Sequence, residues 1–241
     1  MQFNRDSNSY ILIFVAIMVG VVAVSLAFVN TALTPTIKGN EVLSKKIQIL
    51  SSVVSGVEFT PEFVTNEYNT KVEEFFVDSL GDIVTDAAGK PFDLDFKKEL
   101  RKPAGERNYP VFKYKGDKET YYVIPLEGSG LWDRIWGYLA VKEDFVTIHG
   151  SSFGHKGETP GLGALITEDW FTSQFSNKRL FSPEGKYELD IMKGRGNAQV
   201  KTDVYKVDGL SGATITAQGV EDMLYKVVGF YRPFFEKQKV N

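Results

Sequence analysis

Hydrophobic and polar residues divide the chain into one long apolar run and a longer region of mixed pattern. No charged residue occurs from Ser7 to Ile37, and the stretch from Tyr10 to Val29 is almost wholly apolar. This length matches the roughly 20 residues that a helix needs to cross a bilayer. The pattern therefore predicts a short N-terminal tail (residues 1–9) followed by a single transmembrane helix (residues 10–31).

A cleaved signal peptide is the alternative interpretation of this run. The apolar region of a signal peptide usually has only about 7–15 residues and ends at a small-residue cleavage site. The run is longer and has no compelling site of that kind, which favours an uncleaved anchor. Basic residues lie on both sides of it, so charge alone leaves the orientation in the membrane open.

Two helices are predicted after the apolar run. Beyond Pro35, apolar residues recur at steps of three and four, which is typical of one helix face: Leu43, Ile47, Leu50, Val54 and Val57. We expect this juxtamembrane linker and helix (residues 32–57) to dock on the domain that follows. A second helix is indicated by Thr60 as N-cap and Pro61 at the first helical position. Its apolar face would consist of Val64, Tyr68, Val72, Phe75 and Phe76.

The hydrophobic period then shortens to that of strands. Short apolar runs separated by Gly, Pro and charged turns are Ile83–Val84, Tyr121–Ile124, Trp136–Val141 and Val146–Ile148. The region from Asp86 to Lys118 is rich in charge and turn residues, and we interpret it as a surface excursion. The expected fold class is α+β, with one soluble domain (residues 58–241) of short twisted strands and flanking helices.

The amino-acid composition limits the kinds of partner and cofactor that this chain is expected to have. The 241 residues are 43% hydrophobic and 24% charged, which is sufficient for one sizeable core. The net charge of -3 is spread along the chain without a basic stripe, so nucleic acid is not an expected partner. There is no cysteine, and no carboxylate cluster accompanies the two histidines, His149 and His155. We therefore expect no metal site, and any redox chemistry would require an organic cofactor.

The stretch with the most restrictive pattern is Asp-Gly-Leu-Ser-Gly-Ala-Thr at 208–214. An amphipathic helix follows it, with Thr216 as the expected N-cap and an apolar face of Val220, Met223, Leu224, Val227 and Tyr231. Unpaired N–H groups and the helix dipole favour a phosphate at such a terminus. Gly212 and Ala213 would leave the Thr214 hydroxyl uncrowded. The plainer interpretation is an Asp-Gly turn leading through small residues into a capped helix.

Two other stretches could face a planar ligand. Gly128-Ser129-Gly130-Leu131-Trp132 sets a large aromatic side chain beside glycines, although a hairpin turn followed by a core tryptophan has the same composition. In the stretch 155–163, Pro160-Gly161 predicts a tight turn and a following glycine permits close backbone approach. Taken alone, it would be an ordinary loop.

In combination these stretches carry a family resemblance. The 208–214 pattern resembles the flavinylation motif of FMN-binding domains, in which a flavin transferase takes FMN from FAD and joins its phosphate to the last hydroxyl, here Thr214. Gly-Leu-Trp, Glu-Thr-Pro-Gly-Leu-Gly and this motif occur in the same order in the domain shared by the C subunit of the sodium-translocating NADH:quinone reductase and the G subunit of the Rnf complex. The chain is most similar to the C-subunit family, with the FMN-binding core expected at about 125–232.

The resemblance implies a site. The residues expected at the covalently bound FMN are Thr214, Ser211, Gly212, Ala213, Trp132, Glu158, Thr159, Gly161, Leu162 and Gly163. Leu162 and Trp132 would cover the isoalloxazine ring, and Thr214 is favoured over Ser211 and Thr216 as the tether by its place in the motif. Asp208 and Gly209 are expected to serve motif recognition and turn geometry. No catalytic residue is expected on this chain.

The resemblance also implies a function. The chain would relay one electron at a time within a bacterial inner-membrane complex that oxidises NADH, reduces quinone and exports sodium, with its soluble domain in the periplasm. The NADH and quinone sites would lie on other subunits of the complex, because no dinucleotide-binding signature occurs here. Two alternatives remain: an Rnf-type subunit, and a membrane-anchored flavin-binding or assembly module without electron transfer.

Overall fold

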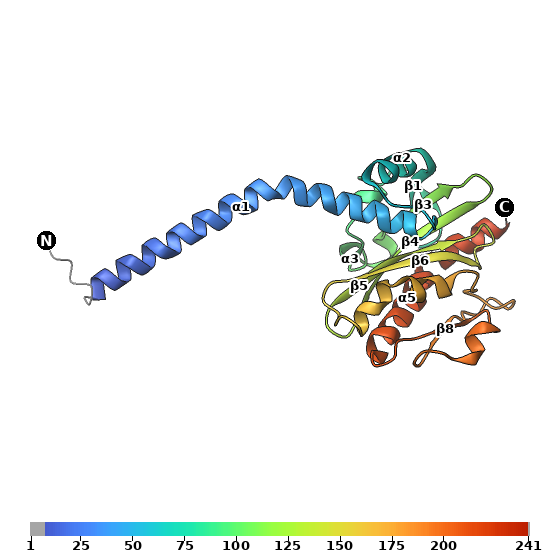
Figure 1. The fold of residues 1–241 in the computed structure, drawn as a ribbon. Coiled ribbons are helices and arrows are strands. Elements are labelled where there is room, and N and C mark those ends of the chain that lie inside the picture. Colours follow the sequence, from blue (N-terminus) through green and yellow to red (C-terminus); the bar gives the residue numbers. More distant parts are fainter. Residues whose placement is uncertain (1–7, 241) are drawn as a thin grey trace. The chain divides into compact units, whose positions relative to one another are not determined.

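The computed structural model describes residues 8–240 (Figure 1). They divide into two compact units, one ending at Lys45 and the other beginning at Lys46. The domain boundaries expected at residues 32 and 58 stay predictions. Most of the expected tail lies outside the described residues.

Helix α1 (Asn8–Ser51) contains the apolar run and is the one helix in the described chain that is long and apolar enough to cross a membrane. The sequence suggested a break at Pro35, but the helix continues through it. Proline removes only one backbone donor, so the other hydrogen bonds of the helix can still form on both sides of it. The predicted stripe is also too long, because Val54 and Val57 follow the end of the helix.

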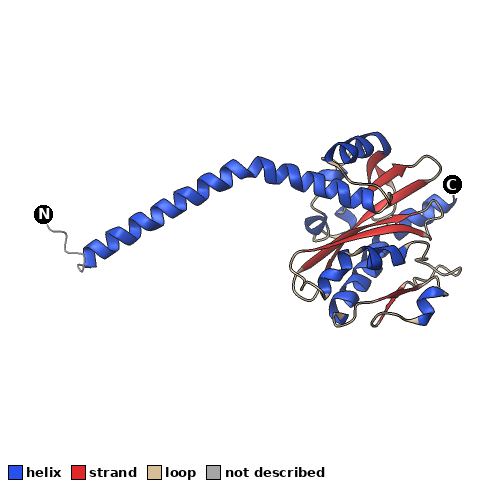
Figure 2. Ribbon diagram, viewed as in Figure 1, coloured by secondary structure: helices blue, strands red, loops and turns tan. Residues whose placement is uncertain are grey.

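The second unit contains a six-stranded antiparallel sheet in the order β2-β1-β3-β4-β5-β6 (Figure 2). The strands are β1 (Val72–Val77), β2 (Ile83–Val84), β3 (Tyr109–Lys115), β4 (Thr120–Ser129), β5 (Arg134–Val141) and β6 (Ile148–His155). A separate parallel pair consists of β7 (Asp190–Met192) and β8 (Lys206–Asp208). The helices of this unit are α2 (Pro61–Lys71), α3 (Phe96–Glu99), α4 (Asp169–Thr172) and α5 (Thr214–Val240). The α+β class is confirmed.

Helix α5 covers one face of the sheet. Ile135, Leu139 and Val141 of β5 belong to the same buried cluster as the apolar residues of α5. The side chain between them, Trp136, points the other way and donates a hydrogen bond from Nε1 to Oε1 of Gln48, near the end of α1 (2.9 Å). This alternation follows from the two-residue period of a strand. Strand β5 carries apolar side chains on both sides and is therefore buried on both faces.

Two sequence-based assignments are wrong. The region 86–118 is not merely a surface excursion, because it contains β3, whose residues Tyr109, Val111 and Phe112 are buried between β1 and β4. The predicted second helix ends at Lys71, so Val72, Phe75 and Phe76 belong to β1. In both cases pairing with distant strands decides the structure, and tertiary pairing readily overrides local pattern. The caps predicted for α2 are confirmed: Thr60 accepts the Phe63 N–H (3.3 Å), and Pro61 begins the helix.

Candidate functional site

Three segments far apart in sequence meet near the start of α5. They are the hairpin loop between β4 and β5 (residues 130–133), the loop after β6 (residues 156–163, the β6 loop) and the motif at 208–214. Strand pairing brings the first two together, because β5 pairs with both β4 and β6. The motif joins them because β8 leads through it into α5, which packs on β4.

Thr214 is exposed and is the first residue of α5. Thr216 was expected as the N-cap, but the helix begins two residues earlier and the Thr216 hydroxyl is buried, 1% exposed. That hydroxyl donates a hydrogen bond to Glu158 and does not cap the helix. The first-turn N–H groups of a 27-residue helix therefore lie beside an accessible hydroxyl.

Leu162 lies over the motif. A Cβ built on Gly212 would come within 3.1 Å of Leu162 Cδ2, and Gly212 has a φ of +78°, a conformation that favours glycine. The β6 loop turns tightly because the Thr159 carbonyl accepts N–H groups from Leu162 (3.1 Å) and Ala164 (3.2 Å). Leu162 nevertheless stays 41% exposed, and Ile215 beside Thr214 is 61% exposed. The tether candidate is thus flanked by accessible apolar side chains.

Glu158 lies beneath this surface and is only 4% exposed. Its Oε2 accepts the Thr216 hydroxyl (2.6 Å), and its Oε1 accepts the backbone N–H of Trp132 (3.0 Å). Its own backbone N–H donates to His155 Nδ1 (3.2 Å). The carboxylate therefore contacts both the hairpin loop and the first turn of α5.

Trp132 itself is 68% exposed. Trp132 lines a cavity of about 430 Å³ together with Lys97, Arg101 and Lys226. Its backbone N–H belongs to the cluster around Glu158.

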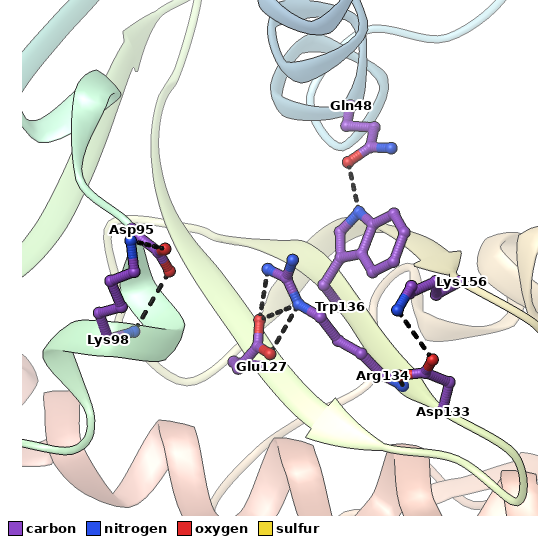
Figure 3. Close-up of polar contacts among 8 residues, drawn as sticks. All are labelled: Gln48, Asp95, Lys98, Glu127, Asp133, Arg134, Trp136 and Lys156. Carbon is purple, nitrogen blue, oxygen red and sulfur yellow. Dashed lines mark hydrogen bonds and ion pairs between the residues drawn. The ribbon is translucent and has the colours of Figure 1, made fainter. Parts of the chain in front are cut away.

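An ion pair between side chains joins β4 and β5, the two strands that flank the hairpin loop (Figure 3). Arg134 Nε lies 2.7 and 2.9 Å from the two Glu127 oxygens, and its Nη2 makes a further bond of 2.7 Å. The Arg134 guanidinium also stacks 5.1 Å from the centroid of Trp136. Burial raises the pKa of Glu127, and the adjacent Arg134 opposes that shift. At the loop itself, Asp133 forms an ion pair with Lys156 of the β6 loop (3.1 Å).

Asp208 organises the backbone next to the motif. Its Oδ2 accepts the Gly196 N–H (2.8 Å), and its Oδ1 accepts the Asn197 N–H (2.9 Å) and side-chain Nδ2 (2.7 Å). Gly209 donates its N–H to the Met192 carbonyl (2.8 Å), and a Cβ at Gly209 would collide with that oxygen. The roles expected of Asp208 and Gly209 in recognition stay predictions.

The predicted site residues therefore divide into two layers. The accessible ones are Trp132, Thr159, Gly161, Leu162, Ser211, Gly212 and Thr214, and the buried ones are Glu158, Gly163 and Ala213. Sequence reasoning missed Thr216 as the partner of Glu158, and its list of site residues left out Gly130 and Gly219. Gly219 is an isolated glycine inside a helical pattern, a signal of close packing that could have been used, and a Cβ there would collide with the Ser129 carbonyl.

Comparisons with known proteins agree with this geometry. Residues 130–229 match the model of the FMN-binding domain family. The C subunit of the Na(+)-translocating NADH-quinone reductase of Neisseria meningitidis serogroup B is 30% identical over 99% of this chain and 97% of its own length. The Pseudomonas aeruginosa C subunit is 29% identical over 94% of this chain and 93% of its own length.

Solved structures give the same result. The crystal structure of the C subunit from Parabacteroides distasonis has a TM-score of 0.70 and 35% identity, covering 84% of this chain and 96% of that one. NqrC from Shewanella oneidensis has a TM-score of 0.71 and 27% identity, covering 84% of this chain and all of that one. The fold is shared with both structures.

Proposed function

The chain belongs to the C-subunit family of the Na(+)-translocating NADH-quinone reductases, and from that membership we propose that it holds FMN covalently through a phosphoester on Thr214. The family and its FMN-binding domain establish a flavin-binding subunit of a membrane redox complex. The threonine linkage and the relay of one electron at a time belong to the proposal.

One observation carries the assignment to Thr214: its side chain is exposed at the first position of a long helix whose terminal N–H groups can receive a phosphate. Ser211 is also exposed, but it precedes the helix. Thr216 is inside the helix, and its hydroxyl is buried against Glu158. Of the three hydroxyls, Thr214 alone combines access with the helix terminus.

The surrounding residues fit a flavin. Gly212 lets Leu162 approach the motif closely, Leu162 supplies an accessible apolar side chain, and Trp132 is available at the hairpin loop. When bound, FMN would supply one-electron oxidation and reduction. The chain would hold the phosphate at the start of α5 and restrict water around the ring.

Partners and location follow from the same proposal. The chain would assemble with the other subunits of the sodium-translocating complex and would require a flavin transferase for maturation. Helix α1 would anchor it in the bacterial inner membrane, with residues from Lys46 onward in the periplasm. The similarity to the C subunits over almost the whole chain supports this role over that of an Rnf-type subunit.

The test is expression of the full chain with a flavin transferase, followed by a denaturing gel viewed for flavin fluorescence. The native chain and Ser211→Ala should fluoresce, and Thr214→Ala should not. Ser211→Ala is the matched control because it removes an accessible hydroxyl from the same motif. Mass spectrometry of peptides from the native chain should find FMN attached to Thr214. Full labelling of Thr214→Ala would exclude Thr214 as the attachment site.

A further inference from the structure

We propose that Glu158 is a positioning residue that fixes the tether helix against the two loops expected to cover the ring, and that it does not itself contact the flavin. This inference rests on the proposed attachment of FMN at Thr214. It changes the role expected from the sequence, where Glu158 was a lining residue of the cofactor.

The contacts of the carboxylate join all three segments. Oε2 accepts the hydroxyl of Thr216, two residues beyond the tether, and Oε1 accepts the N–H of Trp132. At 4% exposure the side chain lies under the accessible layer formed by Leu162 and Thr214. Each of these hydrogen bonds thus involves a residue at or near a predicted flavin contact, but the carboxylate lies on the interior side of that residue.

Two glycines of the site are explained by this carboxylate. A Cβ on Gly130 would collide with Glu158 Oε1, and a Cβ on Gly163 would collide with Glu158 Oε2. Neither glycine has a positive φ, in contrast to Gly161 and Gly212. Their backbone conformations are therefore open to other residues. Space for the carboxylate requires glycine at Gly130, and space for the carboxylate together with the Thr216 hydroxyl requires it at Gly163. The backbones of the hairpin loop and the β6 loop close directly around Glu158.

A buried carboxylate held in this way couples the segments mechanically. Leu162 precedes Gly163, and Trp132 donates directly to Glu158, so a shift of the carboxylate moves both loops relative to α5. Partners that are each satisfied by the others leave few alternative arrangements. Without Glu158, the phosphoester would still hold FMN, whereas the ring would lose the fixed surfaces against which it packs.

The conservative variant Glu158→Gln separates positioning from contact. Thr216 contributes a hydroxyl, which can accept as well as donate. The glutamine amide can keep its oxygen toward the Trp132 N–H and turn its nitrogen toward the Thr216 oxygen, so both bonds survive. Glu158→Ala keeps neither. Glu99→Ala is the control, because Glu99 is equally buried (3% exposed) but its carboxylate accepts the Asn108 N–H (2.8 Å) and pairs with Lys102 (2.8 Å), and neither partner is a site residue.

The experiment uses the full chain in detergent after flavinylation, with gel fluorescence for attachment and flavin fluorescence anisotropy and visible circular dichroism for ring mobility. Glu158→Ala should stay labelled but lose the circular dichroism signal, with a roughly twofold fall in anisotropy. Glu158→Gln and Glu99→Ala should keep both signals. If the alanine variant is not labelled at all, rescue of labelling by glutamine supports positioning.

The proposal is overturned if Glu158→Ala keeps its ring signals, or if glutamine fails to rescue the signals or the labelling. A second measurement needs no flavin. Gly130→Ala is introduced into the unlabelled native chain and into the unlabelled Glu158→Ala chain. The fall in Tm should be at least roughly twice as large in the native chain, because the Glu158→Ala chain lacks the oxygen with which the new Cβ collides. Equal falls in Tm in both backgrounds would refute the positioning role of Glu158. An unlabelled native chain, or a labelled Thr214→Ala chain, would instead count against the proposed function.

Discussion

Replacing Asp208 by asparagine tests whether this motif residue acts through the backbone that it organises. Its two oxygens accept three donors, all of them N–H groups, from Gly196 and Asn197. An asparagine oxygen can keep the two Asn197 bonds, but the amide nitrogen then faces the Gly196 N–H. Two donors cannot pair, in contrast to Glu158→Gln, where the hydroxyl partner can reverse its role.

The magnitude follows from the bonds lost. One hydrogen bond to a charged acceptor is removed, and the remaining two lose their charge assistance, for a total of about 1.5 kcal/mol. Asp208 is partly exposed and water can reach its donors, so the larger values for buried groups do not apply. For a chain of 150–250 residues this corresponds to a fall in Tm of roughly 3–6 °C.

The pH dependence provides an independent check. Burial opposes ionisation of Asp208, but the N–H groups of Asn197 and Gly196 outweigh it and hold its pKa below the ordinary 3.8. A carboxyl whose pKa is lower in the folded state stabilises the fold above the unfolded pKa, and this contribution is lost as pH falls through the folded value. The difference in stability between native and variant should therefore be complete at neutral pH and shrink below pH 3.8.

The assay is thermal unfolding of the full chain in detergent, followed by near-ultraviolet circular dichroism of the buried aromatic side chains. Asp203→Asn is the matched control, because Asp203 accepts one N–H, that of Tyr205 (2.8 Å), and an amide oxygen can keep that bond. A native-like Tm for Asp208→Asn, or a difference that persists unchanged in acid, would falsify the reasoning.

Two further predictions follow from the site and the core. Leu162→Lys places a cation beside the flavin ring and should raise the flavin potential while leaving attachment intact. Thr159→Ala should remove at most a hydrogen bond of about 1 kcal/mol. Redox titration of the flavinylated chains checks both variants, and potentials and spectra equal to those of the native chain would show that the β6 loop does not touch the flavin. Tyr231→Phe should destabilise the fold by about 1–2 kcal/mol because its buried hydroxyl donates to the Pro110 carbonyl (2.8 Å), while Tyr225→Phe, at an exposed position, should be neutral in the same unfolding measurement.

The local pattern was sufficient for features that depend on neighbours in sequence. The apolar run predicted the long N-terminal helix, and Thr60 with Pro61 predicted the start of α2. The three stretches of the site were found because turn residues and a seven-residue motif are contiguous. The motif and its neighbours led to the FMN-binding family, which the comparisons confirmed.

Other features depended on partners far away in the chain. β3 lies in a charged region, and its pairing with β1 and β4 makes it a central strand. The same pairing ends α2 at Lys71, because Val72 begins a strand that the helical spacing of its apolar residues concealed.

The layering of the site was also decided by tertiary structure. By sequence, Glu158 and Thr159 are adjacent members of one loop, yet one is buried and the other exposed. The N-cap expected at Thr216 failed for the same reason, since its hydroxyl bonds a carboxylate 58 residues earlier in the chain. A motif records which residue types are present. Which of them face a ligand and which support it depends on the packing of strands β4 to β6 against α5, and this long-range arrangement leaves no local pattern.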